Sequence, residues 1–441
     1  MKKLRSILIL NTKLKKNLGY LPSYPHYKMN IFSGTNSFDE IKGTYNLLKT
    51  DKIVNGSFIE EYKNNLKTKL NSKNIYTFAS GRMGFYTILK SIGIKAKDEI
   101  IIPSYTCIVV PNAIIYSGAK PIYCDIKEDD FNIDVDKIES LITPNTKVLY
   151  AQHTFGQMCD INAIMTLAKK HNLLVIEDTA LAIGAKLNSK FAGTIGDFGY
   201  YSTDRSKVIN TGLGGIVSVN NEKHLDSFEK YYEDIPFLNE EYSKKIARTF
   251  MINLFTLNPY TYWFGKFLNA LLSKFKMMTY FLDEQFTDMN EIKKYPYPAK
   301  LSNIFAKIGI SQIKSLSNNI DNRKNIVKYY NNLLNIYSDD YINDDRNIFL
   351  RYSFLVKNRD YWEHKFSSKI DLSIWFKTIA SGKNENFEVI GYEVGTNDVS
   401  EYVCDHIFNL PTHNKVKPKK LKKLLLELKN SGDIITKEKN L

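Results

Sequence analysis

The residue best suited to covalent chemistry in this chain is Lys207. It follows a strand-like stretch that ends at Ser202, and it precedes a glycine-rich turn at residues 211–215. A lysine held between a strand and a tight turn can be partly removed from water, which lowers its pKa and frees the amine for Schiff-base formation. Taken alone, however, Lys207 is one of 61 basic residues, and most such lysines are solvated surface groups.

Two other loops carry groups that would complement such a lysine. Asp178 comes directly after an apolar run, and a carboxylate there could keep a pyridinium nitrogen protonated. Gly81 and Arg82 precede a predicted helix over residues 85–91, and the free N–H groups at a helix start suit a phosphate. Each feature also has a plain structural interpretation, because strand-end aspartates and such turns commonly serve only as helix caps or in loop salt bridges.

The elements that position these loops alternate in type between residues 75 and 220. The pattern predicts helices at 109–117 and 161–171, and strands at 100–102, 121–124, 148–151, 173–176, 199–202 and 215–219. Such alternation is typical of a parallel sheet, which binds ligands at the carboxyl ends of its strands. Asp178 and Lys207 both follow predicted strands, so we expect their side chains to meet at one sheet edge.

The rest of the chain indicates three parts. We predict an N-terminal segment at 1–37, a large domain at 38–298 with a helical insertion at about 222–297, and a small C-terminal α/β domain at 299–441. The small domain should begin with a long helix over 301–334 and contain a strand at 352–356. The first ten residues have a short apolar run that lysines soon follow, which favours a soluble segment over a signal peptide.

Composition narrows the classes of function. With 43% apolar residues the chain can bury a real core, and its four scattered cysteines indicate neither disulfides nor a metal site, as expected in a reducing cytoplasm. The net charge of +14 is spread along the chain, and its densest cluster, residues 415–429, is predicted to form a helix with a solvated basic face. We therefore expect no nucleic-acid partner.

The order of these motifs, a phosphate-binding turn, then Asp, then Lys, is the one that pyridoxal 5'-phosphate (PLP) enzymes of the aspartate-aminotransferase fold use. The chain resembles the DegT/DnrJ/EryC1/StrS family of sugar aminotransferases. The matching stretches include "ASGRMGFYTILKSIGIKAKDEIIIPSYTC", "HTFGQMCDINAIMTLAKKHNLLVIEDTALAIGA" and "GTIGDFGYYSTDRSKVINTGLGGIVSVNN". Weaker similarity continues through "KLSNIFAKIGISQIKSL" and "IFNLPTH", so the resemblance covers most of the chain from about Phe38.

The resemblance implies the fold and the site. The expected fold is α/β, of type I among PLP enzymes, with a large domain built on a mostly parallel, seven-stranded-type sheet and a smaller C-terminal α/β domain. Lys207 would bond to PLP, Asp178 would pair with the pyridine nitrogen, and the phosphate would be bound by Gly81, Arg82 and Ser202. His153 matches the family's histidine before an aromatic-Gly pair, so its position is either catalytic or that of a buried structural histidine.

Four positions depart from the family pattern. Arg82 stands where a threonine is usual, and Cys107 stands where an aromatic residue usually stacks on the PLP ring. Leu181 replaces a polar Gln or His, and Pro298 replaces an asparagine that reaches the neighbouring subunit's phosphate. These departures indicate a divergent branch of the family.

The family resemblance implies an aminotransferase that moves an amino group from an amino acid, expected to be glutamate, to a nucleotide-linked keto sugar. Such sugars serve surface polysaccharides, including lipopolysaccharide, and the enzyme would be a homodimer. One alternative is a sugar dehydratase of the same fold, but in that branch histidine replaces the lysine. A basic protein that binds nucleic acid or a membrane surface is the alternative from another class.

The sequence does not decide what the aromatic stretch at 250–282 packs against. Ten aromatic residues and several lysines fall within it, and Pro259 interrupts the apolar run, which is shorter than the roughly 20 residues that a membrane span needs. A helical hairpin buried against the core or the dimer mate is the first interpretation. Contact with a membrane surface, where aromatic rings sit at headgroup level and lysines meet anionic lipid, is the second.

Overall fold

A seven-stranded sheet forms the centre of the computed structural model, which describes residues 27–32, 34–275, 277–279 and 297–435. The strand order is β1-β10-β9-β6-β5-β2-β4, and the five strands from β9 to β4 are parallel, whereas β10 is antiparallel to both of its neighbours. The strands are β1 (Ile75–Phe78), β2 (Glu99–Pro103), β4 (Lys120–Cys124), β5 (Thr146–Gln152), β6 (Leu174–Asp178), β9 (Phe198–Ser202) and β10 (Gly215–Val219). The predicted α/β fold with its mostly parallel sheet is confirmed, and all six predicted strands belong to this sheet.

Helices pack along this sheet and explain why its strands are buried at most positions. Helix α4 (Gly81–Ser91) lies against β9 and β10, α5 (Val109–Ser117) lies against β4, and α7 (Ile161–His171) lies against β5 and β6. Helix α5 ends as predicted at Gly118, whose φ of 99° is a left-handed conformation that glycine adopts without strain. The shorter elements here are β3 (Thr106–Cys107), α6 (Val135–Ile138), β7 (Lys186–Leu187), β8 (Lys190–Phe191) and α8 (Leu225–Glu233).

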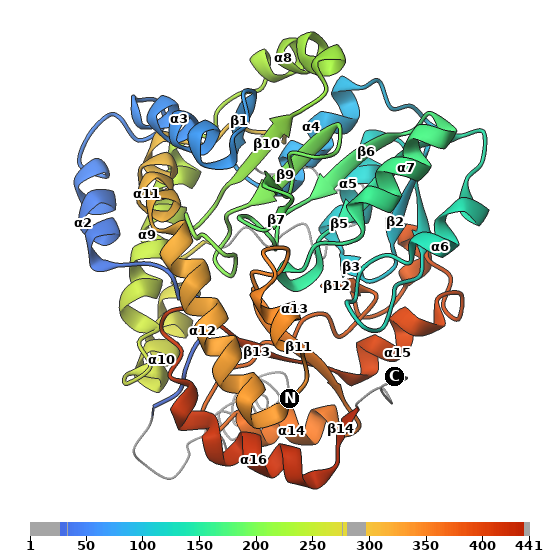
Figure 1. Cartoon of the computed structure of the whole chain (residues 1–441). Coiled ribbons are helices and arrows are strands. Elements are labelled where there is room, and N and C mark those ends of the chain that lie inside the picture. The colour runs from blue at the N-terminus through green and yellow to red at the C-terminus, as the bar shows by residue number, and fades with distance from the viewer. Residues whose placement is uncertain (1–26, 33, 276, 280–296, 436–441) are drawn as a thin grey trace, which may run out of the picture.

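A second, three-stranded sheet organises residues 351–435, which we call the small-sheet unit and which lies below the main sheet in Figure 1. Its strands are β11 (Arg351–Val356), β13 (Ile407–Pro411) and β14 (Ile434–Ile435), and its helices are α14 (Arg359–Phe366), α15 (Asp398–His406) and α16 (Lys422–Ser431). The predicted strand at 352–356 and the basic C-terminal helix are both present, although the α-helix begins only at Lys422. Leu421, Leu425 and Leu428 are buried on its apolar face.

The long helix predicted at 301–334 is two helices, α11 (Asn303–Lys314) and α12 (Leu316–Leu334). The break lies at Ser315, whose backbone has a ψ of 2° and whose hydroxyl donates to the carbonyls of Ser311 and Gln312. Such side-chain bonds compete with the helix ladder, and the sequence pattern does not reveal them. Helix α11 packs against α3 (Phe58–Leu70), and the domain boundary at 298/299 stays a prediction.

The helical insertion is present as α9 (Glu240–Thr256) and α10 (Tyr262–Lys274), which form a hairpin beside α2 (Phe38–Leu47) (Figure 1). The two helices touch directly at Gly265, where a side chain would lie 1.5 Å from the carbonyl oxygen of Thr256. Helix α9 is buried along one face, but the outer face of α10 is exposed. Within the described ranges no helix combines the length and apolarity needed to cross a membrane, and the part of the 250–282 prediction at 276 and 280–282 lies outside them.

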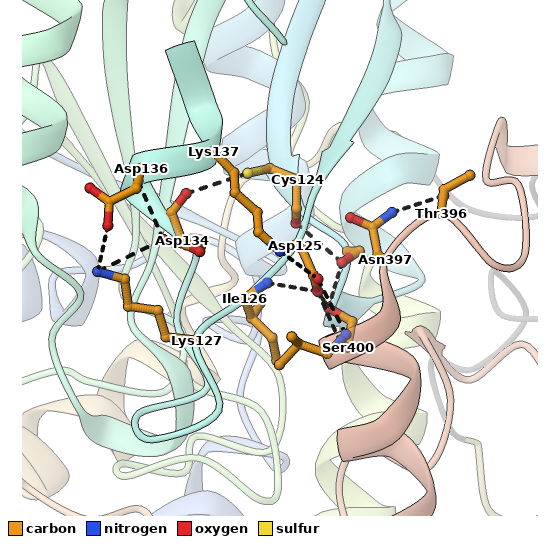
Figure 2. Close-up of polar contacts among 12 residues, drawn as sticks. Cys124, Asp125, Ile126, Lys127, Asp134, Asp136, Lys137, Thr396, Asn397 and Ser400 are labelled. Atoms are coloured by element: carbon orange, nitrogen blue, oxygen red, sulfur yellow. Dashed lines mark hydrogen bonds and ion pairs between the residues drawn. The ribbon is translucent and has the colours of Figure 1, made fainter. Parts of the chain in front are cut away.

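The small-sheet unit is attached to one edge of the large sheet at two places. Strand β12 (Ala380–Ser381) pairs in parallel with β3, directly after β2. The second attachment is Asp125, directly after β4, which accepts hydrogen bonds from the backbone and hydroxyl of Ser400 (2.9 and 2.8 Å) and from the backbone of Val399 (3.2 Å). Figure 2 shows Lys137 reaching the same carboxylate, with its ammonium at 3.0 Å. Asp125 therefore caps the N-terminus of α15 from the large sheet.

Replacing Asp125 with asparagine should loosen α15. Burial raises the pKa of Asp125, but hydrogen bonds from Ser400 and Lys137 outweigh it and lower the pKa below its usual 3.8. The charged form is thus favoured in the folded state, and its stabilisation is complete above pH 3.8 and lost as the pH falls through the lower folded value. We expect backbone amides of α15 to exchange about tenfold faster in Asp125→Asn at neutral pH. The difference should shrink in acid, and equal exchange at neutral pH would show that the cap contributes nothing.

Candidate active site

A cavity of about 210 Å³ opens at the carboxyl ends of the parallel strands. Its walls come from the N-terminus of α4, the ends of β6 and β9, the loop after β9, and the segment 375–382 of the small-sheet unit. The structure brings six of the seven predicted site residues to this cavity: Gly81, Arg82, Cys107, Asp178, Ser202 and Lys207. The departure residue Leu181 also lines the cavity, whereas Pro298 is not among its lining residues.

Asp178 is held at the end of β6 with its carboxylate in a fixed orientation. In the sheet register it lies between Gln152 of β5 and Tyr200 of β9, and all three side chains line the cavity. The hydroxyl of Tyr150 donates to its Oδ2 (2.6 Å), and the backbone of Ala180 donates to its Oδ1 (2.8 Å). Because each oxygen has its own donor, the carboxylate presents a defined negative group to a ligand.

Tyr150 and Tyr200 support this carboxylate as a pair of linked phenols. Their hydroxyls are hydrogen-bonded to each other, and Tyr200 stacks on Phe85, with 5.3 Å between ring centroids. Burial, followed by repulsion from the charge of Asp178, raises the pKa of both phenols well above the usual value. Both therefore stay protonated and act as donors towards the carboxylate at neutral pH.

The start of α4 offers a place where an anion can bind. Ser80 is the N-cap of this eleven-residue helix, and its buried hydroxyl has no hydrogen-bond partner within the described part of the chain. The first residue of β10, Gly215, packs so tightly here that a side chain on it would come within 2.4 Å of the Ser80 and Gly81 backbone. An unpartnered buried hydroxyl at a helix N-terminus, beside Ser202 and Arg82, fits a phosphate group.

Lys207 lies in the loop 203–214, which is closed at its base by hydrogen bonds from the backbone of Thr203 to Gly214 and from Thr211 to Thr203 (both 2.9 Å). The side chain is half-buried at the cavity, with its ammonium 5.0 Å from the ring centroid of Trp375. Burial lowers the pKa of Lys207, and the charges of Asp178 and Asp204 only partly oppose it. A larger fraction of the amine is therefore neutral and nucleophilic than in a surface lysine.

Cys107 forms part of the cavity wall at the junction with the small-sheet unit. It pairs with Ser381 across β3 and β12, and its thiol lies 3.6 Å from the Ser381 carbonyl oxygen. Burial raises the pKa of the thiol, so it stays neutral and behaves as a small apolar group. The aromatic surfaces of this cavity come instead from Phe85, Tyr200, Trp375 and Phe376.

His153 does not reach the cavity, so the structure does not join it to the other six predicted site residues. Its side chain is fully buried, and its Nδ1 accepts from the backbone of Cys159 (3.2 Å). The proton therefore sits on Nε2, which donates to Glu177 (3.0 Å). Glu177 also accepts from the backbones of Gly193, Ile195 and Gly196, so the pair stabilises the loop that precedes β9. The geometry is that of a structural histidine, the second of the two interpretations above.

Several cavity residues had no counterpart in the sequence reasoning: Tyr150, which supports Asp178 from behind, and the lining residues Gln152, Tyr200, Trp375 and Phe376. Strand register could have indicated Gln152 and Tyr200, because both are level with Asp178, but the order of strands in the sheet must be known first. Trp375 comes from an irregular segment of a different sheet, and no local pattern marks it. Only the tertiary fold brings it to Lys207.

This architecture defines the class of the protein as a type I fold of the PLP-enzyme kind, and solved structures agree. The structure titled as DesI with its TDP-sugar product matches with a TM-score of 0.69 and 16% identity, over 94% of this chain and 96% of that one. The E. coli GDP-4-keto-6-deoxy-D-mannose-3-dehydratase with bound hydrated PLP matches with a TM-score of 0.68 and 19% identity, over 92% of this chain and all of that one. At these identities the likeness concerns the fold.

Sequence comparison gives the family. Residues 36–236 and 271–429 match the DegT/DnrJ/EryC1/StrS aminotransferase family, and the chain belongs to that family. The GDP-perosamine synthase of Caulobacter vibrioides is 38% identical over 167 residues, which are 38% of this chain and 45% of the relative. The chain thus spans about half the length of the curated relatives it matches. The predicted resemblance is confirmed.

Proposed function

We propose that this chain is a PLP-dependent aminotransferase that moves an amino group from an amino acid to a nucleotide-linked keto sugar. The observation that carries the proposal is the half-buried Lys207, whose amine shares one cavity with the held carboxylate of Asp178 and the anion-binding start of α4. The family membership supports the reaction class, and relatives named for perosamine and for a 3-amino sugar support the substrate class.

The cavity offers a complementary group for each polar end of PLP. Ser80, Ser202, Arg82 and the N–H groups that begin at Gly81 would hold the phosphate. Asp178 would pair with the ring nitrogen and keep it protonated, since Tyr150 and the Ala180 backbone fix its oxygens. Bound PLP supplies an electron sink that stabilises negative charge on the substrate carbon next to nitrogen.

The protein's own contribution to turnover centres on Lys207. Its lowered pKa leaves Nζ able to accept a proton from the amino-acid carbon and to return it to another carbon as the amino group changes hands. Trp375 and Phe376 line the cavity from the small-sheet unit and would pack against a bound ligand, while water still has to enter to supply the keto oxygen of the departing acid. The amino donor, which we expect to be glutamate, would give up its nitrogen and leave as a keto acid.

The decisive experiment follows the nitrogen atom. The purified chain, loaded with PLP, is incubated with ¹⁵N-labelled glutamate and a panel of nucleotide-linked keto sugars, and products are identified by mass spectrometry. We expect one sugar to gain the labelled nitrogen while 2-oxoglutarate accumulates in equal amount. No transfer to any sugar, although a control aminotransferase converts the same panel, would count against the proposal.

The dehydratase alternative is measured in the same reaction. A structural neighbour is a dehydratase with bound hydrated PLP, so the shared fold permits that chemistry. A dehydratase of the deoxygenating branch would convert a sugar to a product that has lost one hydroxyl oxygen and carries no ¹⁵N label. Lys207 favours transfer of nitrogen, because the deoxygenating branch carries histidine at that position. A role in surface polysaccharide or lipopolysaccharide synthesis, a homodimer and a cytoplasmic location stay predictions from the family resemblance and the composition.

A further inference from the structure

Helix α10 has a buried face and an exposed apolar face, and within the described part of the chain only the first packs against another helix. Tyr262 and Gly265 are buried against α9, and Asn269 bonds to Thr256 (2.8 Å) and Asn253 (3.2 Å) on the same side. The opposite face carries Phe264, Phe267, Leu271 and Phe275 at helical spacing. The three phenylalanines are 66–67% exposed, which is unusual for a contiguous stripe on a soluble surface.

Basic residues flank this stripe. Lys274 is exposed at the C-terminal end of α10, and Lys266 is exposed beside the stripe. At the other end, the exposed ring of Tyr260 packs near Lys417 and Lys420, whose ammonium groups lie 5.4 and 5.7 Å from its centroid. We call the stripe, Tyr260 and these four lysines the α10 surface.

Basic groups outnumber acidic ones around the stripe, where Asp371 pairs with Lys266 (3.4 Å). From Tyr242 to Leu282 the chain contains no Asp or Glu, although it has 47 acidic residues among 441. The same stretch contains these basic residues: Lys244, Lys245, Arg248, Lys266, Lys274 and Lys276. Lys244 and Lys245 pair with Glu240 and Glu241 at the start of α9 (both 2.5 Å). The like charges that a second copy would bring together at the stripe are therefore those of Lys274, Lys417 and Lys420. An anionic lipid surface would neutralise them and accept the aromatic rings.

We propose that the α10 surface binds the headgroup region of an anionic phospholipid membrane. The helix would lie flat on the surface, with Phe264, Phe267 and Phe275 entering the headgroup and acyl boundary. Lys274 and Lys420 would meet lipid phosphates. The inference goes beyond the proposed enzyme activity and does not depend on it, because binding is measured without substrate.

The test uses the full chain and sedimentation with vesicles. The probes are vesicles of equal parts phosphatidylglycerol and phosphatidylcholine, and vesicles of phosphatidylcholine alone. We expect co-sedimentation only with the anionic vesicles, with partial release at high salt. Replacing Phe264, Phe267 and Phe275 together with serine should weaken binding about tenfold or more. A matched triple variant, Tyr361→Ser, Val389→Ser and Val394→Ser, removes exposed apolar groups elsewhere and should bind normally.

A second pair of variants tests whether the lysines contribute to vesicle binding. It keeps the proposal testable if the triple phenylalanine variant fails to fold. Lys274→Gln with Lys420→Gln should weaken binding about tenfold, whereas Lys147→Gln with Lys190→Gln, an equal loss of charge at exposed sites, should not. Wild-type protein that stays in solution with anionic vesicles overturns the proposal. Equal loss of binding in a variant and its matched control also overturns the proposal. A dimer that light scattering detects in the wild type and not in the triple phenylalanine variant does so too, because a second copy would then cover the stripe.

Discussion

Replacing Lys207 with alanine should abolish covalent attachment of PLP and reduce turnover by about 100-fold to 10,000-fold, the usual contribution of a positioned acid–base group. The reason is that burial lowers the pKa of Lys207, so a larger fraction of its amine is neutral and has a free electron pair at the cavity. The phosphate-binding start of α4 is unchanged in the variant, so PLP should still bind reversibly. Borohydride reduction followed by peptide mapping locates the attachment.

The control for Lys207→Ala is Lys190→Ala, which removes an exposed lysine on β8 and should keep both the yellow colour and full turnover. Wild-type protein after reduction should carry the modified peptide at Lys207. An adduct on another lysine, or none, would remove Lys207 from the site. Added methylamine should restore part of the activity of Lys207→Ala, because it supplies the missing base without repairing the fold.

Asp178→Asn should lower turnover at least about 100-fold while leaving PLP affinity far less affected. An amide cannot keep the ring nitrogen of PLP protonated, so negative charge on the substrate carbon loses its stabilisation. The phosphate contacts at Ser80 and Ser202 lie at another wall of the cavity and are untouched. Turnover at saturating PLP and an absorbance titration of PLP measure the two quantities separately.

The matched variant for Asp178→Asn is Asp160→Asn. Asp160 caps α7 outside the cavity by accepting from the backbone of Ala163 (3.0 Å), and asparagine caps helices equally well. It should therefore be neutral in both assays. If Asp178→Asn turns over at nearly the wild-type rate, Asp178 only organises the loop through Ala180 and has no part in the chemistry.

The large sheet was predictable because its strands are short, apolar and separated by helices with clear ends, such as the left-handed Gly118 after α5. Six of the seven predicted site residues share one cavity for the same reason, since each follows or opens a regular element. His153 shows the limit: a histidine one residue past a strand end turns inward when a buried carboxylate, here Glu177, lies beneath it. Sequence spacing does not distinguish the two directions.

What the sequence could not predict depends on contacts between distant segments. The break at Ser315 follows from hydrogen bonds that its hydroxyl donates to carbonyls of its own helix, and the hydrophobic pattern of the sequence does not reveal such bonds. Trp375 reaches Lys207 only because β12 pairs with β3 across 274 positions of chain, between Cys107 and Ser381. The exposure of the outer face of α10 could not be predicted either, because an apolar helical pattern predicts burial and does not identify the surface that covers the helix.

The attachment of β12 to β3, together with a further hydrogen bond beside it, also constrains motion. Ser381 is paired with Cys107, and the Phe376 backbone donates to the hydroxyl of Tyr105 (2.9 Å), so the cavity wall contributed by the small-sheet unit is fastened to the large sheet. If the remainder of that unit swings, its hinge lies at this attachment and the wall stays in place. The pocket is then preorganised, and a ligand binds without the entropic cost of ordering the wall. Gating by domain closure, which limits turnover in many enzymes, would have little influence on this one.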